Sequence, residues 1–586
     1  MAPMAANVPI TVIFSTFCAL TIVPWLAHHL LKNTPPRRQT DEDKNTPSRI
    51  SRFYRWVVSP FLDSRRNRYL LLLLILLLLV AAALLALFRM VPLKMLPFDN
   101  KNEFQIVVDM PEGTALEHTD QVVQALEVFL QQVPEVTSIV SYTGIAAPMD
   151  FNGLVRHYYL RQGGHVADMR VNLLDKSERS QQSHAIVLRL RTALEAIAAR
   201  TGATFKIVEV PPGPPVLSTI VAELYGSPDM PYDDLVAAAA HIRGIMAEEP
   251  FVVDIDDMVE AVRTKIDFLI DKEKAALHGI SPTVITQALQ TALSGATPVT
   301  VHTPGERQPL MVRTILPRDK RSGAVALSQI TVKTSAGGLV PLAELTRAIS
   351  MPEPQPVYHK NLERVVYVLA EMAGRAPAEA VLDMQKKLVD QPAPTGVRVQ
   401  WAGEGEWQIT LRVFRDMGIA FAAALMGIYI LMIVETGSFS MPLLIMMAIP
   451  LTLIGAMPGF WLLNLITGHP VGGFDNPVFF TATGMIGMIA LGGIVIRNAL
   501  VLIEFIQDAV KEGLPLREAI LRSGAIRMRP ILLTATTTAI GAWPITLDPV
   551  FSGLAWTLIF GLLASTLFTL LVIPVAYYAL VRPRPS

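Results

Sequence analysis

Cysteine is nearly absent from this chain, because Cys18 is the only one among its 586 residues. A single cysteine excludes a disulfide within the chain and a zinc cluster built on cysteines. Charge is also scarce: only 17% of the residues are charged, and their formal net charge is zero. A neutral chain gives no bulk electrostatic reason to expect nucleic acid as a partner, and we expect none.

The short motifs of common enzymes are missing as well. The sequence has no Walker A loop, zincin helix, nucleophile elbow or dinucleotide-binding glycine pattern. We therefore expect a protein that is not an enzyme and that holds no cofactor. The acidic residues Asp254, Asp256 and Asp257 are expected to be solvated charge rather than a calcium site, so no metal site is predicted.

Apolar residues are abundant, because 51% of the chain is hydrophobic. A membrane-spanning helix needs roughly 20 mostly apolar residues. The sequence predicts a multi-pass membrane protein with one long hydrophilic insert, about Val91–Arg415. The seven runs that qualify as spans are Val8–Leu31, Tyr69–Phe88, Met417–Ile433, Pro442–Leu465, Pro477–Ile506, Ile531–Thr546 and Phe551–Leu580.

Basic residues in the short loops predict the orientation. Residues 32–68 carry ten lysines and arginines, among them Arg37, Arg38 and Lys44. By parity, the loop after the fifth span and the tail with Arg582 and Arg584 lie on the same side. The opposite loops, 466–476 and 547–550, have no lysine or arginine. We therefore expect the first group in the cytoplasm and the large insert outside it.

An amphipathic helix is predicted within the first of these loops. Ile50–Leu62 places Ile50, Phe53, Trp56, Val57 and Phe61 at helical spacing, with arginines between them. This pattern is typical of a helix lying on the cytoplasmic membrane surface. A packed connector helix gives the same pattern, and the two interpretations are compatible.

The hydrophilic insert repeats a strand–helix–strand theme, which predicts two ferredoxin-like modules. The first has strands at Glu103–Met110, Val136–Tyr142, Met169–Leu173 and Phe205–Val210, with helices at Thr114–Gln132 and Ser183–Arg200. Thr114 and Glu117 have the spacing of a capping box. After the linker Pro211–Pro215, the second module has strands at Ile220–Tyr225, Phe251–Asp257, Val365–Met372 and Val397–Trp401, with helices at Tyr232–Ala247 and Pro377–Val389.

An insertion, about Arg263–Ile349, interrupts the second module. It contains a predicted hairpin, Val299–Thr303 with Leu310–Ile315, that turns at Pro304-Gly305. Its apolar residues exceed what the hairpin can pack by itself, so we expect a docking element. The predicted fold class is an α-helical membrane bundle with an α+β extracytoplasmic region of two ferredoxin-like modules, the second split by a docking insertion.

The segment Gly492–Phe505 places Arg497 near the middle of an apolar span, beside Asn498 and two turns before Glu504. Ionisable groups at that depth are costly and face a protein interior or a water-filled path, usually with a partner carboxylate. No carboxylate at comparable depth occurs elsewhere in this sequence. We therefore expect the partner on another chain, or on a missing part of a larger protein.

Four segments together resemble the second half of resistance-nodulation-division (RND) efflux transporters: Asp271–Ile280, Gly338–Leu345, Arg497–Phe505 and Arg527–Thr534. The resemblance implies span six at 1–32, a cytoplasmic loop with the amphipathic helix at 33–68, and span seven at 69–90. It also implies a first periplasmic module at 91–212, a second at 216–262 and 351–405, the docking insertion at 263–350, and a five-span bundle at 406–586. The N-terminal half is expected to be missing.

The resemblance also implies a function: export of amphiphilic compounds across the inner membrane of a Gram-negative bacterium, driven by the proton motive force. The expected partners are two further copies in a homotrimer, a periplasmic adaptor, an outer-membrane channel, the missing N-terminal half and the lipid membrane. The implied proton-relay residues are Arg497, Thr534, Asn498, Arg527 and Glu504. The loop Gly144–Gly153, with Met149 and Phe151, matches a substrate loop of drug exporters.

One departure concerns Arg497, because drug exporters of the family usually have lysine at its position. Arginine keeps its proton at any relevant pH, so Arg497 can hold and release a carboxylate without titrating.

Each of these roles has a structural alternative. Arg497 would form a locking ion pair, Thr534 would bond its own helix, Glu504 would be an interfacial pair, Arg527 a positive-inside anchor, and Gly144–Gly153 a surface loop. For the chain, the alternatives are a relative that assists protein translocation, a heavy-metal exporter, and an isolated fragment without activity.

Overall fold

The computed structural model describes residues 2–32 and 49–581. Arg37, Arg38, Lys44, Arg582 and Arg584, which entered the orientation argument, lie outside this range. The chain divides into two compact units. Unit 1 comprises Met1–Leu77, Ile496–Ala535 and Thr566–Ser586, and unit 2 comprises Leu78–Val495 and Thr536–Ser565.

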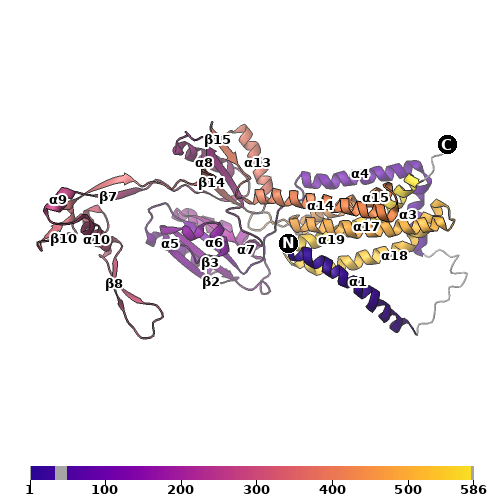
Figure 1. Cartoon of the computed structure of the whole chain (residues 1–586), viewed down its shortest axis with the longest axis horizontal. Coiled ribbons are helices and arrows are strands. Elements are labelled where there is room, and N and C mark those ends of the chain that lie inside the picture. Colours follow the sequence, from indigo (N-terminus) through magenta and orange to yellow (C-terminus); the bar gives the residue numbers. More distant parts are fainter. Residues whose placement is uncertain (1, 33–48, 582–586) are drawn as a thin grey trace. The chain divides into compact units, whose positions relative to one another are not determined.

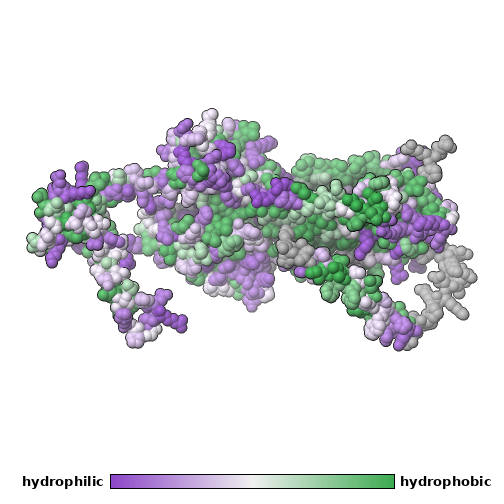
Figure 2. Space-filling view, in the orientation of Figure 1, coloured by the Kyte–Doolittle hydropathy of each residue, from purple (hydrophilic) through white to green (hydrophobic). Residues whose placement is uncertain are grey.

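Seven helical segments in the described residues are long and apolar enough to cross a membrane, as the sequence predicts. Exposed leucines cover α4, and Figure 2 shows hydrophobic residues over this helix. The segments are α1 (Ala2–Leu31), α4 (Arg65–Leu87), α14 (Glu406–Thr436), α15 (Ser440–Met446) with α16 (Pro450–Thr467), α17 (Ala482–Lys511), α18 (Leu516–Ala542) with η3 (Trp543–Leu547), and α19 (Ser552–Val581).

Two of these helices begin well before the predicted apolar runs. α14 starts at Glu406 rather than Met417, and α18 starts at Leu516 rather than Ile531. Hydropathy marks only the part of a helix that lipid can surround, whereas backbone hydrogen bonds continue through polar turns. As a consequence, Arg527 and Arg529 lie inside α18 rather than in a loop.

The amphipathic helix α3 (Arg49–Asp63) packs within unit 1. Tyr54, Val58 and Leu62 are buried, and the Tyr54 hydroxyl donates to the Leu570 carbonyl oxygen of α19 at 3.0 Å. α3 is also tied to α18 by the ion pairs Arg55–Glu518 and Asp63–Arg517, the second with distances of 2.7 and 3.0 Å. The predicted apolar residues Ile50, Phe53 and Trp56 remain exposed. The helix is therefore a packed connector that also presents an aromatic face.

The first sheet module, β1 to β4 with α5 and α7, is an antiparallel sheet in the order β2-β3-β1-β4. One face of the sheet packs on the two helices, with Phe104, Ile106, Leu126, Met169 and Leu194 in the core. This module belongs to unit 2. Its elements are β1 (Glu103–Asp109), α5 (Leu116–Leu130), β2 (Val136–Ile145), α6 (Phe151–Val155), η1 (Tyr158–Leu160), β3 (Gln162–Leu173), α7 (Ser183–Thr201) and β4 (Thr204–Glu209).

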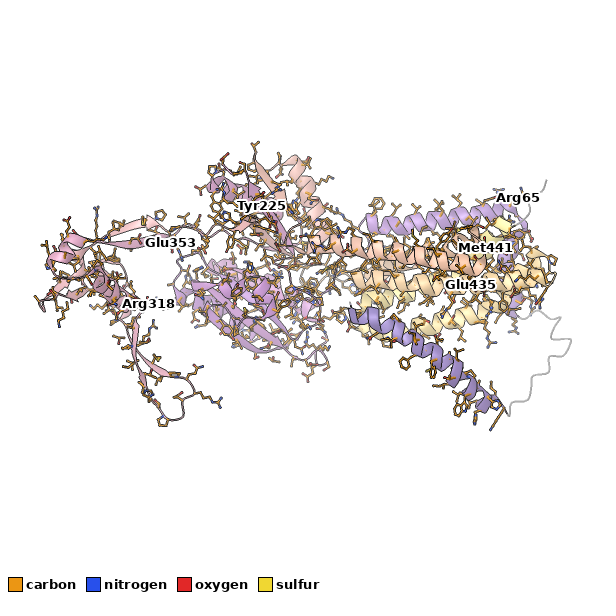
Figure 3. The ribbon with its side chains drawn as sticks, viewed as in Figure 1. Arg65, Tyr225, Arg318, Glu353, Glu435 and Met441 are labelled. Carbon is orange, nitrogen blue, oxygen red and sulfur yellow. The ribbon has the colours of Figure 1, made fainter. Side chains whose placement is uncertain are left out.

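The predicted capping box at Thr114 is wrong. α5 has Ala115 as its N-cap and no side-chain cap, and the Thr114 hydroxyl donates to the Pro111 carbonyl oxygen at 2.6 Å. Glu117 instead pairs with Arg318 of η2 (Arg318–Lys320), which Figure 3 labels. The Thr114 hydroxyl therefore bonds the turn at Pro111 instead of capping the N-terminus of α5, which the spacing had predicted.

The second sheet module repeats this arrangement, with strand order β6-β14-β5-β15 and the short β13 beside β14. Ile220, Leu224, Ile242, Val366 and Met384 are central to its core. The two strand–helix–strand halves lie about a hundred residues apart in the chain, yet β5 and β14 pair directly. The elements are β5 (Ile220–Gly226), α8 (Tyr232–Ala247), β6 (Val252–Asp257), β13 (His359–Lys360), β14 (Glu363–Met372), α13 (Pro377–Asp390) and β15 (Val397–Gln400).

The insertion leaves and re-enters the second module through paired strands, β7 (Thr264–Ile270) and β12 (Thr346–Pro352). It has a small core around Ile285, Leu342 and Leu345. The predicted hairpin is present as β8 (Ala296–Val301) and β9 (Leu310–Thr314), and Figure 1 shows it leading away from α10. Its apolar side chains are exposed. The remaining elements are α9 (Lys272–Leu277), α10 (Pro282–Leu293), α11 (Ala324–Ser328), β10 (Thr331–Lys333), β11 (Leu339–Pro341) and α12 (Leu342–Leu345).

The contact between α3 and α18 gives a first prediction. A Cβ at Gly524 would overlap the Tyr54 ring, so Gly524→Ala should displace that ring and break its hydrogen bond to Leu570. We expect a loss of about 1–3 kcal/mol in the free energy of unfolding. Gly541→Ala is the matched control on the same helix, because nothing lies within 4 Å of its Cβ; alanine there should be neutral or stabilising. Unfolding of the purified chain in detergent checks both, and an equal response would contradict the predicted packing.

Candidate functional site

Arg497, Asn498 and Glu504 lie on α17, within its unit 1 part. Arg497 and Glu504 are exposed and seven residues apart, which places them along one face of the helix, whereas Ala499, Leu502 and Ile503 are buried on the other. Asn498 is half-buried. Within the described residues, no carboxylate lies at ion-pair distance from Arg497. Its side chain therefore faces away from the part of the protein that packs α17.

The contact between α17 and α18 in unit 1 is made by Phe505, not by Glu504. The Ser523 hydroxyl donates to the Phe505 carbonyl oxygen at 3.0 Å, and the Arg527 guanidinium lies 3.6 Å from the centre of the Phe505 ring. A cation over an aromatic face is attracted by the ring quadrupole, and more strongly where water is excluded. Arg527 is half-buried by this contact. Glu504 is exposed on α17 beside it.

Thr534 lies two turns further along α18 and is exposed. Its hydroxyl donates to the Ile531 carbonyl oxygen of the same helix at 3.0 Å. This is the local bond that helix-interior threonines commonly form. The structure therefore brings Phe505 and Arg527 together, and it leaves Arg497 and Thr534 on exposed faces of their helices.

The loop Gly144–Gly153 ends on the short helix α6 in the first sheet module. Asp150 caps α6 by accepting from the Gly153 amide, and it pairs with Arg170 at 2.7 Å. Met149 and Phe151 are exposed, each by more than 60%. Gly144 has a φ of 84°, a backbone conformation that other residues rarely adopt. The loop is thus anchored at one end and presents two apolar side chains.

Three ion pairs join the two sheet modules, and they correct the interpretation of the acidic cluster as solvated. Asp254 pairs with Arg191, with both side chains about 4% exposed, and it also accepts from the Ile207 amide at 3.1 Å. Asp256 pairs with Lys206, and Glu371 pairs with Arg156 at 2.6 Å. Every cation comes from the first module and every carboxylate from the second.

Backbone geometry aims Asp254 at the first module. Its φ is 53°, and the pairing of β6 with β14 slips at this point, between Leu369 and Glu371. A bulge of this kind redirects a side chain at the cost of local strain. Burial raises the pKa of Asp254, although Arg191 acts against it. For Glu371, burial is outweighed by Arg156 and by the hydroxyl donors Thr219 and Ser218, so its pKa lies below the usual range.

A cavity of about 750 Å³ lies between the loop after α6, the second sheet module and the first turn of α14. Its walls include Val155, His157, Met258, Tyr358 and Tyr367, and the two tyrosine rings meet edge to face at 6.4 Å. Lys360, Glu404 and Arg412 supply charge at its rim. The cavity thus combines aromatic and aliphatic side chains with several polar and charged groups, a mixture that can contact both parts of an amphiphilic molecule.

Glu223 organises the polar side of this cavity. Its carboxylate, about 1% exposed, accepts from Lys360 at 2.7 Å and from the Tyr225 hydroxyl at 2.7 Å; Figure 3 labels Tyr225. Lys360 also pairs with the exposed Glu404 at 2.6 Å. Burial, followed by the bond to Glu223, raises the pKa of Tyr225. Burial disfavours the charged form of Lys360, but Glu223 and Glu404 outweigh it and raise its pKa.

Sequence reasoning did not identify this cavity, because its residues come from segments more than 250 positions apart. One local signal was available: Gly403 and Gly405 flank Glu404 just before α14. A Cβ at Gly403 would overlap the Glu223 carboxylate, so the glycine is required by that side chain. The pattern shows that something approaches the backbone closely, but not which residue.

Comparison with known proteins gives one consistent result. A profile of the AcrB/AcrD/AcrF family matches residues 1–581. The swarming motility protein SwrC of Bacillus subtilis (strain 168) is 23% identical over 99% of this chain and 52% of that protein. The multidrug resistance protein MdtC of Proteus mirabilis (strain HI4320) is 23% identical over 96% of this chain and 52% of that protein.

Two further likenesses concern heavy-metal proteins. The cobalt-zinc-cadmium resistance protein CzcA of Cupriavidus metallidurans (strain ATCC 43123 / DSM 2839 / NBRC 102507 / CH34) is 29% identical over 53% of this chain and 28% of that protein. A crystal structure of a heavy metal efflux pump has the same fold, with a TM-score of 0.71 at 20% identity, over 90% of this chain and 52% of the other. The chain thus spans about half the length of the relatives that it matches along its whole length.

The two partners of Lys360 give a prediction about the cavity. Glu223→Ala would remove the buried acceptor of Lys360 and of the Tyr225 hydroxyl and leave Lys360 with only the exposed Glu404, and we expect a loss of about 3 kcal/mol in the free energy of unfolding. Glu404→Ala is the matched control, because it removes an exposed partner and should cost below about 1 kcal/mol. Pulse proteolysis of the purified chain in denaturant measures both, and similar losses would show that burial does not set the strength of this network.

Proposed function

Because the chain belongs to the AcrB/AcrD/AcrF family of resistance-nodulation-division permeases, we propose that it is the C-terminal half of a proton-driven pump that exports amphiphilic or drug-like compounds. It is a multi-pass membrane protein. In the proposed arrangement it lies in the inner membrane, with the hydrophilic insert in the periplasm. The observation that carries the proposal is Arg497: a permanent cation in the apolar helix α17, exposed on its helix face.

A charge facing hydrocarbon costs several kcal/mol, and such residues in membrane helices pair with a carboxylate or face water. The face of α17 that carries Arg497 is therefore an interface in the working protein. We assign its partner to the aspartates that family pumps carry on span four, which belong to the N-terminal half. Protonation of those carboxylates would remove their attraction to Arg497, and this gives two packings of the helices with different proton content.

The other relay residues support this pairing in different ways. Asn498 can hydrogen-bond the incoming carboxylate beside Arg497, and Thr534 can exchange its bond to Ile531 for one to the relay. Arg527 holds Phe505 against α18 and so fixes the turn of α17 that carries Glu504. In this proposal Arg527 and Glu504 line the cytoplasmic end of the proton path, while Arg497 remains protonated throughout.

Export also needs a substrate site outside the membrane. We propose that the two sheet modules are the ferredoxin-like modules of such pumps, and that the cavity lined by Tyr358 and Tyr367 receives the compound. Met149 and Phe151, on the loop Gly144–Gly153, supply adaptable apolar contacts. The exposed apolar hairpin β8–β9 suits docking between copies in a homotrimer, which would act with a periplasmic adaptor and an outer-membrane channel.

A second candidate is heavy-metal export, which the names of CzcA and of the crystallised efflux pump favour. The aromatic and apolar walls of the large cavity favour an organic compound instead. The two candidates separate in cells that carry the pump, because an amphiphile exporter raises tolerance to dyes and detergents and a metal exporter raises tolerance to zinc or cobalt. The alternative of a translocation-assisting relative does not explain the hairpin. As an isolated polypeptide, with Arg497 unpaired, we expect no transport and no need for a cofactor.

The test of the relay uses this chain coexpressed with an N-terminal half of an RND permease that carries the two aspartates, in a strain without its own exporters. Arg497→Ala should abolish dye export, because the carboxylates lose the cation that holds them, while trimer assembly persists. Arg522→Ala, an exposed arginine of α18, is the matched control and should export normally. Dye efflux and native gel migration are measured together. Full export by Arg497→Ala refutes the relay, and loss of assembly identifies a structural ion pair instead.

A further inference from the structure

A second, much smaller cavity of about 100 Å³ lies at the base of the two sheet modules. Its walls come from the segment after α4, the linker before β5, both sheet modules and the first residue of α14. A water molecule needs about 10–15 Å³ of such space, so several waters fit inside. The ionisable residues that line the cavity are Lys94, Arg156, Arg191, Glu209, Glu371 and Glu406.

Most of these charges are already paired. Arg156 pairs with Glu371, Arg191 pairs with Asp254, and Glu209 accepts from His184 at 2.7 Å through one oxygen. Glu406 has no ion pair within the described residues, and burial raises its pKa. The other oxygen of Glu209 is buried without a hydrogen-bond partner. Among the cations that line this cavity in the described part of the chain, Arg156 and Arg191 have carboxylate partners and Lys94 has none.

Lys94 is only 6% exposed, and within the described part of the chain its ammonium has no hydrogen bond and no ion pair. Its nearest partner is the ring of Phe98, 3.3 Å from the ammonium nitrogen to the ring centre. The other face of Phe98 is taken by the His184 ring, which stacks on it at 3.5 Å and 8°. An aromatic face attracts a cation far less than water or a carboxylate solvates it.

Burial lowers the pKa of Lys94, and Glu406, Glu209 and Glu371 offset this only in part. A buried lysine without a partner at contact distance commonly gives up its proton rather than remain charged. Lysine can do so, whereas the arginines around it cannot. Water inside a cavity of this volume would give the proton a route, because Lys94 and Glu209 line the same space.

We propose that Lys94 is a second proton-exchanging residue of this protein, outside the membrane relay: it is neutral while the small cavity is closed and binds one proton when the cavity opens to water. The inference rests on the proposed proton-driven function for its role in transport. Movement of the modules would then take up and release a proton on the side from which protons enter. Lys94 can therefore exchange a proton, whereas Arg497, at a position where drug exporters usually have lysine, cannot.

The neutral state of Lys94 determines how the stability of the folded protein depends on pH. A neutral Lys94 in the folded protein means that unfolding takes up a proton at neutral pH, so stability rises with pH up to the ordinary lysine pKa. One proton corresponds to a tenfold change in the folding equilibrium constant per pH unit. The groups that face Lys94 are Glu406 of α14, Glu209 of β4, Glu371 of β14, Arg156 just after α6, Arg191 of α7, and His184 of α7 on the far side of Phe98.

The experiment compares Lys94→Met and Lys94→Arg with wild type, using denaturant unfolding of the purified full chain at pH 6, 7, 8 and 9. Methionine carries no proton that folding must remove, so Lys94→Met should be more stable than wild type. The ratio of its folding equilibrium constant to that of wild type should fall about tenfold per pH unit across the range where Lys94 is neutral. Arginine cannot become neutral, so Lys94→Arg should be the least stable of the three. Lys101→Met, an exposed lysine paired with Asp99, is the matched control and should show no such trend.

The opposite ranking overturns the proposal. If Lys94 remains charged and pairs with Glu406 across water, Lys94→Arg is tolerated and Lys94→Met is destabilised at every pH. A Lys94→Met effect that does not change with pH also overturns it, because packing alone would then explain the gain. Proton uptake on unfolding, measured by titration of wild type against Lys94→Arg, remains informative if the methionine variant fails to fold. None of these measurements depends on export, so they test the protonation of Lys94 even if the proposed transport function is wrong.

Discussion

The cost of holding charge away from water governs every candidate site in this protein. A buried or lipid-facing charge needs a partner of opposite sign, a set of hydrogen bonds or a change of protonation state. The chain uses all three solutions. Asp254 has Arg191, Glu371 has Arg156 with two hydroxyl donors, and Lys94 has only an aromatic ring and a cavity. Arg497 is exposed on a helix face that the proposed function buries against another half.

The seam between the two sheet modules is formed by ion pairs. Buried pairs contribute little net stability, because the charges lose hydration when they come together and regain it when they part. An apolar seam of the same area would be more costly to open. The seam is nevertheless specific: all cations lie on one module and all carboxylates on the other. Even the strained backbone at Asp254 serves this alignment.

The polar side of the large cavity follows the same rule with a different outcome. Glu223 is almost fully buried, but its carboxylate accepts from Lys360 and from the Tyr225 hydroxyl, and Lys360 also pairs with Glu404. The network holds Lys360 and Glu404, which line the cavity beside Gly403. In the proposed function, the wall with Tyr358 and Tyr367 contacts the exported compound.

The amino-acid sequence by itself determined the elements. Seven spans, the amphipathic helix, the strands of both sheet modules and the hairpin of the insertion all follow from local periodicity, because a segment's apolar pattern is repeated within a few residues. The position of Arg497 within a membrane span could also be predicted, because the apolar run around it is continuous in the sequence. The capping box predicted from Thr114 and Glu117 was wrong, because Thr114 bonds the Pro111 carbonyl oxygen and Glu117 pairs with the distant Arg318.

Only the tertiary structure decided which charges meet. Nothing in the segment around Asp254 indicates Arg191, and nothing around Lys94 indicates Phe98 and His184, because such pairs depend on how whole elements pack. Asp254, predicted as solvated charge, is therefore buried, and the cavity between Tyr358, Tyr367 and α14 could not be foreseen. Local sequence specifies how the backbone satisfies its own hydrogen bonds. The environment of a side chain is set by residues hundreds of positions away.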